Sequence, residues 1–276
     1  MFTGDQLNFP DSSKLLANAT SLTWTTPNLY GFLFHYRGNG EGEVASRFRE
    51  SSGRWRQAAP QVGQHGLGDR YVAPVELSGD REAQAALFVR IAGSYMDANH
   101  RKRHMYTWLP NHLMDGREQV SPRSFLRALS MAVEVTREGY ASYQYALHYE
   151  GIRQGVQEAS RIRVKEVAED VPWVTTAVGD LSGTQVPTEP ESIVARWTER
   201  SLGDRLAAEL AAMDPDTNEG GVRTGPKDPH DYLTLIDELC ELGVMTRRVN
   251  GRVDLPDVYR IAFGIGRRGG VPRIRQ

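Results

Sequence analysis

Amphipathic helical patterns dominate the chain. Residues 78–96 place Ala83, Leu87 and Ile91 four residues apart, which is the spacing of a helix that buries one face. Residues 121–139 show the same pattern, and there Ser121 and Pro122 form a typical helix start. By the same criteria, further helices are predicted over residues 26–36, 149–173, 189–213 and 230–242.

Only short stretches predict β-structure. The Asn250–Gly251 pair lies between "VMTRRV" and "RVDL", which predicts a two-residue hairpin with a type I′ turn. Weaker strand signals occur near 20–24 and 70–77. The predicted fold is therefore mainly α. We expect a bundle-like helical domain over 1–213, a linker over 214–229, and a small winged-helix-like α+β domain over 230–276.

Composition narrows the class of protein. The 276 residues are 39% hydrophobic and 25% charged, which is typical of a globular protein, and the net charge of −2 argues against a chain that coats nucleic acid. No apolar run is long enough to span a membrane, and the N-terminus lacks a secretory pattern, so we expect a cytoplasmic protein. The single cysteine, Cys240, excludes an internal disulfide and is expected to be buried and unreactive.

One arginine departs from the polar pattern of its helix. At 100° per residue, Arg163 lies about 20° from Ile152, inside an apolar stripe with Val156 and Ala159, while Arg161 faces the opposite side. An inward-facing guanidinium needs an anion. That anion would be either a carboxylate of the fold or the phosphate of a nucleotide reached from a helical lid.

The C-terminal tail is basic. Residues 243–276 hold eight arginines against two aspartates. Arg247, Arg248 and Arg252 lie on the predicted hairpin, where they could neutralise DNA phosphates. The alternatives are a solvated hairpin or a wing that contacts protein. No basic helix precedes the hairpin as a recognition helix would, which favours a structural wing.

Familiar catalytic motifs are missing from the sequence. There is no His-Glu-x-x-His, no Gly-x-Ser-x-Gly and no Gly-x-x-x-x-Gly-Lys-Ser/Thr. His100 and His104 are four residues apart, but the basic residues of "NHRKRH" disfavour a bound cation. The sequence therefore predicts neither catalytic residues nor a metal site, and leaves open whether the protein takes part in an enzyme.

Several segments, in order, resemble the C-terminal part of bacterial P-loop ATPases of the STAND and AAA-related kind, some of which belong to phage-linked or conflict gene clusters. The segments are "FPDSSKL" (9–15), "LTWTTPNLYGFLF" (22–34), "YTWLPNHLMDGREQVSPRSFLRALSMAVE" (106–134), "GIRQGVQEASRIRVKEVAEDVPW" (151–173) and the tail ending in "DVYRIAFGIGRRGGV".

The resemblance implies a helical lid followed by a winged helix, in which Arg123 and Arg163 match lid arginines that approach the γ-phosphate of a nucleotide. In such ATPases the phosphate-binding loop precedes the first matching segment, so we expect either a truncated or split gene product or a divergent protein that kept only the lid and the tail. It would be a non-catalytic regulatory or partner-binding piece, using ATP and Mg²⁺ only with a core from another chain. The alternative is a DNA-binding winged-helix regulator.

Overall fold

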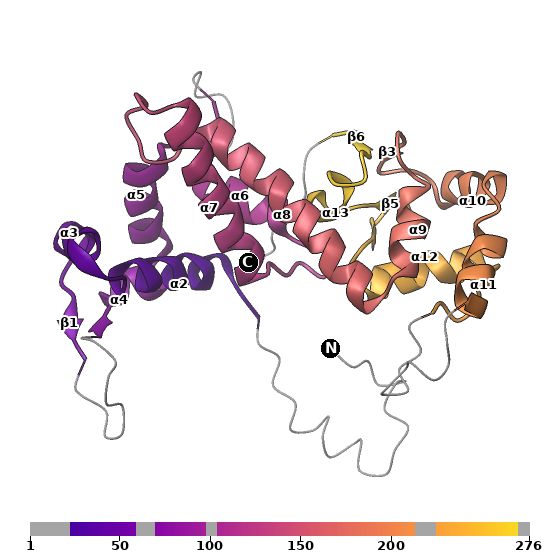
Figure 1. Ribbon diagram of the computed structural model, residues 1–276, viewed down its shortest axis with the longest axis horizontal. Coiled ribbons are helices and arrows are strands. Elements are labelled where there is room, and N and C mark those ends of the chain that lie inside the picture. Colours follow the sequence, from indigo (N-terminus) through magenta and orange to yellow (C-terminus); the bar gives the residue numbers. More distant parts are fainter. Residues whose placement is uncertain (1–22, 59–69, 98–103, 213–224, 270–276) are drawn as a thin grey trace, which may run out of the picture.

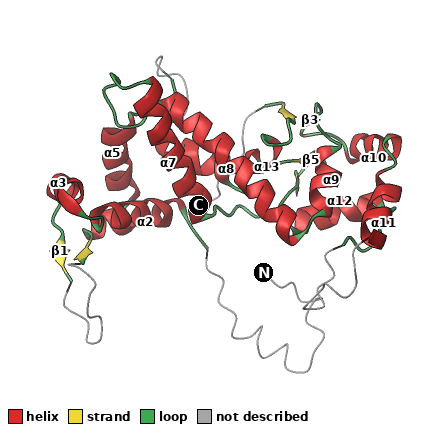
Figure 2. Ribbon diagram, viewed as in Figure 1, coloured by secondary structure: helices red, strands yellow, loops and turns green. Residues whose placement is uncertain are grey.

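The fold is mainly helical, as the sequence predicts. The computed structural model describes residues 23–58, 70–97, 104–212 and 225–269, in which helices carry most of the structure and strands are short (Figure 2). Within these ranges, no helix combines the length and the apolar character needed to cross a membrane. The predicted segment at 9–15, His100 and residues 214–224 of the predicted linker lie outside the described residues.

Twelve described helices and three two-stranded pairings make up the fold (Figure 1). The helices are α2 (Thr26–Gly38), α3 (Gly42–Ser52), α4 (Val75–Gly79), α5 (Arg81–Ala92), α6 (Met105–Leu113), α7 (Pro122–Gly139), α8 (Tyr149–Asp170), α9 (Trp173–Gly179), α10 (Pro190–Glu199), α11 (Leu202–Ala212), α12 (Tyr232–Glu241) and α13 (Asp257–Arg260). Antiparallel pairs join β1 (Arg56–Gln57) to β2 (Tyr71–Val72) and β4 (Thr246–Arg247) to β5 (Val253–Asp254), and a parallel pair joins β3 (Gln185–Val186) to β6 (Gly266–Arg267).

Side-chain caps begin the principal helices where the sequence indicates. Asp80 accepts hydrogen bonds from the backbone N–H groups of Glu82 and Ala83 at the start of α5. Ser121 caps α7, and Pro122 is its first residue, as predicted. Thr25 caps α2, and Thr26 is its first residue, which is also where the predicted range of 26–36 begins.

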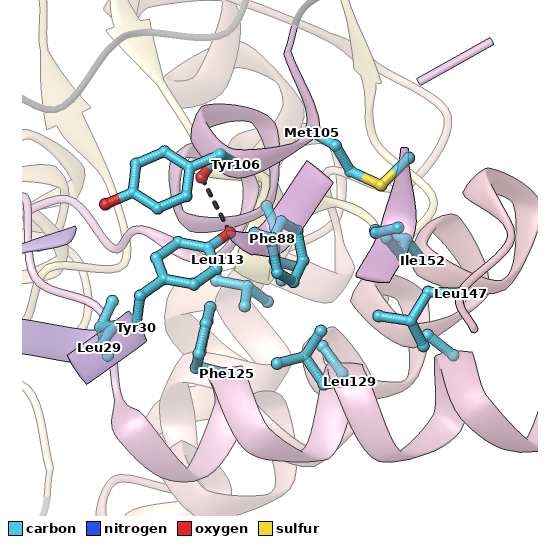
Figure 3. Packing of buried hydrophobic residues seen from close by; sticks show 14 of the residues in the cluster. Leu29, Tyr30, Phe88, Met105, Tyr106, Leu113, Phe125, Leu129, Leu147 and Ile152 are labelled. Carbon is cyan, nitrogen blue, oxygen red and sulfur yellow. Dashed lines mark hydrogen bonds between the residues drawn. The ribbon is translucent and has the colours of Figure 1, made fainter. Parts of the chain in front are cut away.

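Helices α2, α4–α7 and the first half of α8 surround one hydrophobic core, which we call the N-lobe together with α3 and β1–β2 (Figure 3). Its centre is aromatic: the Tyr30 ring stacks on Tyr106 at 4.1 Å between centroids, with Phe88 and Phe125 edge-on to Tyr30. The two tyrosine hydroxyls at this centre are satisfied by neutral groups. Tyr30 Oη donates to the Tyr106 carbonyl over 2.9 Å, and Tyr106 Oη donates to Gln84 Oε1 over 2.7 Å.

Two glycines allow α7 and α8 to pack closely. A Cβ atom at Gly155 would lie 2.1 Å from the Ala128 carbonyl oxygen, and one at Gly151 would lie 2.8 Å from that of Ala132. Both distances are too short for a side chain. Because the two glycines are four residues apart, they share one face of α8 and form a groove for the α7 backbone.

A second hydrophobic core lies at the other end of α8, which crosses between the two (Figure 1). It contains Trp197 and Tyr259 and joins α9–α12, the β4–β5 hairpin and α13; we call this region, with the second half of α8, the C-lobe. Residues 173–206 thus share a core with 235–265. This grouping differs from the expected division at 214–229. The composition of a segment predicts where a loop lies. Which helices form one domain depends instead on which of them bury side chains in the same core.

Two local predictions are wrong in detail. The helix predicted over 189–213 breaks into α10 and α11, where Ser201 has a positive φ of 49°. The hairpin is also not a two-residue type I′ turn. Gly251 has φ 83° and its N–H bonds to the Arg248 carbonyl, while Asn250 has no positive φ. This is the three-residue loop in which only the glycine is left-handed.

Candidate functional site

The two arginines predicted to contact phosphate meet at one carboxylate. Arg163 of α8 lies 3.3 Å from Glu166 Oε2, and Arg123 of α7 lies 3.2 Å from Glu166 Oε1. The Arg163 side chain is 30% exposed and also donates from Nε to Tyr259 Oη over 3.2 Å. Burial opposes the charge of Arg163, but Tyr259, Glu166 and Asp115 outweigh it and raise the pKa of this guanidinium. The nearest anion is therefore a carboxylate of the same helix.

A similar cluster lies further along the same helix pair. Arg127 of α7 and Arg161 of α8 both face Glu158, at 3.7 Å and 3.4 Å. Arg161 is 66% exposed, on the wet face, in agreement with its predicted orientation. The two arginine–glutamate–arginine clusters have the same charges and the same parent helices. Only the first has Tyr259 and Asp115 as neighbours.

A cleft of about 580 Å³ lies where the α6–α7 connection meets the β4–β5 hairpin, between the two lobes. Gly116 forms the closest crossing: its N–H donates to the Gly243 carbonyl over 2.7 Å, and a Cβ there would lie 2.4 Å from the Met245 carbonyl oxygen. The volume is in the range of small-molecule pockets. Its wall combines carboxylates with guanidinium groups.

A buried ion network forms the C-lobe wall of this cleft. Arg267, only 5% exposed, lies 2.8 Å from Asp254 Oδ2 and 3.0 Å from Asp257 Oδ1. Arg248 pairs with Asp254 at 2.6 Å, and Arg260 pairs with Asp257 at 2.6 Å. Both aspartates are 1% exposed, so their charges depend on these arginines.

Two further groups belong to this network: a carboxylate oxygen of Asp254 that has no donor in the described ranges, and His112 of the N-lobe, which approaches Asp257. Asp254 Oδ1 is buried and accepts no hydrogen bond from the described residues, although Oδ2 accepts from both Arg248 and Arg267. His112 of α6 stacks on Trp108 and lies with Nε2 3.5 Å from Asp257 Oδ2 and Nδ1 2.7 Å from the Trp108 carbonyl. Because both nitrogens face oxygens, the geometry accommodates an imidazolium that donates from each.

Asp115 anchors the N-lobe wall. Its Oδ1 accepts from the backbone N–H groups of Arg117 and Gln119, each over 2.9 Å, and so holds the turn that brings Gly116 to the hairpin. Burial raises the pKa of Asp115, and the two backbone donors and Arg163 only partly offset this shift. The residue thus connects the cleft to the Arg163 cluster.

The arginines proposed for DNA contact are all held by carboxylates. Arg247 pairs with Asp237 at 2.6 Å and Arg252 with Glu189 at 2.7 Å, both at the surface. Arg248 belongs to the buried network through Asp254. A phosphate would have to compete with a carboxylate at each of these three arginines.

Metal and thiol chemistry find little support in the described ranges. They hold no group of three or more His, Cys, Asp or Glu side chains arranged to bind a metal ion. His104 precedes α6 as its N-cap residue, and His100 lies outside the described residues. Cys240 is a partly buried free thiol, and burial raises its pKa to about 11, which disfavours the thiolate at neutral pH.

Sequence reasoning missed the network around Arg267, Asp254 and Asp257. A signal was available, since the two aspartates stand among Val253, Leu255 and Val258 in an otherwise apolar segment. An acid within an apolar run indicates a buried, paired charge. The partner could not be read, because Arg267 is ten or more residues away and reaches both acids only through the β3–β6 pairing.

Comparisons with known proteins identify no relative: no protein-family model matches the chain, and no curated protein or solved structure is detectably similar to it.

Proposed function

We propose that this chain is a non-catalytic regulatory or partner-binding protein with the role of the lid and winged helix of a P-loop ATPase. It would act in the cytoplasm, where its single cysteine would stay a free thiol. Its partner would be an ATPase core supplied by another chain. That core would bring the nucleotide and Mg²⁺. The observation that carries the proposal is the convergence of Arg123 and Arg163 on the single carboxylate of Glu166.

This cluster is suited to an incoming anion. Two guanidiniums share the carboxylate of Glu166, and Asp115 is the further acid that acts on Arg163, so Arg123 has no acid other than Glu166 as its ion-pair partner among the described residues. Arg123 is 79% exposed and can leave Glu166 without desolvation, whereas Arg163 is fixed by Tyr259. A phosphate chain that reached this place would find one mobile and one positioned guanidinium, as transferred phosphoryl groups require.

Tripolyphosphate tests the anion site on this chain alone. Calorimetric titration at low ionic strength should detect binding, and the Arg123→Gln, Arg163→Gln double variant should weaken it about tenfold. The matched control is Arg127→Gln, Arg161→Gln, which removes the same charge from the same helices at the Glu158 cluster. If both variants weaken binding equally, the clusters merely join α7 to α8 and the phosphate role fails.

Reconstitution tests the regulatory role. A reading frame beside this gene that encodes a phosphate-binding loop would be expressed, and its ATPase rate measured with and without the full chain. We expect the chain to bind and raise the rate, with the effect falling about tenfold or more for Arg163→Gln. A rate that is unchanged by the chain, or equally stimulated by the variant, contradicts the proposal.

A further inference from the structure

A second hollow lies in the N-lobe, away from the interlobe cleft. It has a volume of about 620 Å³ and is bounded by the α3–β1 connection on one side and by α4 and α5 on the other. None of the residues that line it lines the interlobe cleft. Its size corresponds to that of a small molecule rather than a protein surface.

The floor of this groove is apolar. Leu77 of α4 and Leu87 of α5 belong to the buried N-lobe core and line the groove from below. Ala83 and Ala86 of α5 leave space above them because their side chains are short. Val75 also lines the groove and is 77% exposed, so an apolar side chain faces solvent at its edge. Covering this surface would be favourable.

The rim of the groove is basic. Arg54, Arg56 and Arg90 line it, against Glu76 as the one acid among the lining residues. Arg90 donates from Nη1 to the Ser51 carbonyl over 3.0 Å, which holds α5 to the end of α3. Within the described ranges, no carboxylate forms an ion pair with Arg54 or Arg56. Other N-lobe arginines such as Arg37 and Arg81 likewise have no carboxylate partner within these ranges, so what sets Arg54 and Arg56 apart is their place at the edge of an apolar groove.

The backbone before these arginines is held in a conformation that presents them. Gly53 has φ 128°, and a Cβ there would lie 2.9 Å from Cγ of Pro74. Only glycine fits both the angle and the approach. Trp55 then turns inward, where its Nε1 donates to Ser52 Oγ over 2.9 Å, which leaves Arg54 and Arg56 exposed on either side of it.

We propose that this groove binds a small anionic amphiphile, a molecule with an apolar body and a carboxylate or similar head group. The apolar body would cover Leu77, Leu87 and the alanines of α5, and the head group would pair with Arg54 and Arg56. The volume of the groove suits a small molecule, and the three arginines against one glutamate at its rim favour a negative head group.

Decanoate is the probe, titrated calorimetrically into the full chain below its micelle concentration, with decyltrimethylammonium as the cationic match. We expect decanoate to bind one to one, at least about tenfold more tightly than the cation. Arg54→Gln, Arg56→Gln should weaken decanoate binding about five- to tenfold. Arg137→Gln, Arg161→Gln removes the same charge elsewhere on the surface and should leave binding unchanged.

A second variant tests the shape of the site independently of charge. Ala86→Trp places a large ring in the groove from an exposed helical position and should abolish binding while the circular dichroism and melting temperature remain those of the parent. Equal affinity for the anion and the cation, an unchanged affinity in Arg54→Gln, Arg56→Gln, or full binding by folded Ala86→Trp would each overturn the proposal. None of these results bears on the Arg163 cluster, which lies on α7 and α8.

Discussion

The main buried polar clusters of the two lobes differ in charge. In the N-lobe, Tyr30, Tyr106 and Gln84 form a neutral hydrogen-bonded chain within an aromatic core. In the C-lobe, Asp254 and Asp257 are equally buried but depend on the positive charge of Arg267 and its neighbours. A neutral chain needs only good geometry, whereas a buried ion pair must also offset the loss of hydration of both partners. The C-lobe should therefore be far more sensitive to the loss of one side chain.

The largest effect is expected from Arg267→Leu. This change leaves two buried carboxylates with reduced compensation and should lower the free energy of unfolding of the C-lobe by about 3–5 kcal/mol. Hydrogen exchange followed by mass spectrometry would assign the loss to peptides from 173–199 and 232–267. Arg247→Leu is the control, because its pair with Asp237 is exposed and contributes at most about 1 kcal/mol. Equal losses in the two variants would refute the difference between buried and surface pairs.

A backbone contact should be the most sensitive feature of the N-lobe. Gly155→Ala forces a Cβ against the Ala128 carbonyl and should cost about 1–3 kcal/mol, measured by urea unfolding. Gly139→Ala, at the end of the partner helix, meets no atom within 4 Å and should be neutral or stabilising by up to about 1 kcal/mol. If Gly155→Ala also left the free energy of unfolding unchanged, α7 and α8 would not pack as closely at this position as described.

Removing one hydroxyl sharpens the comparison of neutral and charged networks. Tyr106→Phe leaves the buried Gln84 Oε1 without its donor and should cost about 1–2 kcal/mol. In the C-lobe, Tyr259→Phe removes an acceptor of Arg163, which keeps Glu166 and partial solvent contact, so its cost should be smaller. Parallel urea titrations of both variants would measure the two costs. A larger loss of stability for Tyr259→Phe than for Tyr106→Phe would contradict this expected order.

The smallest effect concerns the wall of the interlobe cleft and depends on pH. The pKa of Asp115 is raised above 3.8 in the folded protein, so the folded state binds the proton more tightly than the unfolded one. The contribution of Asp115 to the free energy of unfolding therefore decreases as the pH rises from 3.8 through the pKa of the folded state. Above that pKa the decrease is complete. Asp115→Asn keeps an oxygen for the N–H groups of Arg117 and Gln119.

We accordingly expect Asp115→Asn to stabilise the protein slightly at neutral pH and to have a diminishing benefit as the pH approaches 3.8. Urea unfolding of both proteins across this range measures the difference. Asp231→Asn is a useful contrast, because hydrogen bonds from Thr234 lower the pKa of Asp231, so this change should destabilise at neutral pH. A loss of stability in Asp115→Asn at neutral pH would contradict the burial effect.

Helices were predictable from the sequence because their signals are local. The cap and first proline of α7, the apolar spacing of α5 and the long run of α8 each depend on residues within one or two turns. The break between α10 and α11 was harder to predict from the sequence. Gly203 lies against His230 and Pro229, where a Cβ would be 2.6 Å from the histidine ring, and this contact comes from a segment 26 or more residues away.

The sequence by itself determined the helical class of this protein, the start of its main helices and the presence of Arg163 within an apolar stripe, because periodicity and capping act between neighbours. Only the tertiary structure decided which helices share a core, which anion faces Arg163, and that Asp254, Asp257 and Arg267 meet in the interior. Those features depend on contacts between distant residues, whose charges and volumes must be satisfied together. For the same reason, only the tertiary structure shows that Arg54 and Arg56 have no carboxylate partner in the described ranges, because ion pairing depends on how the surface folds.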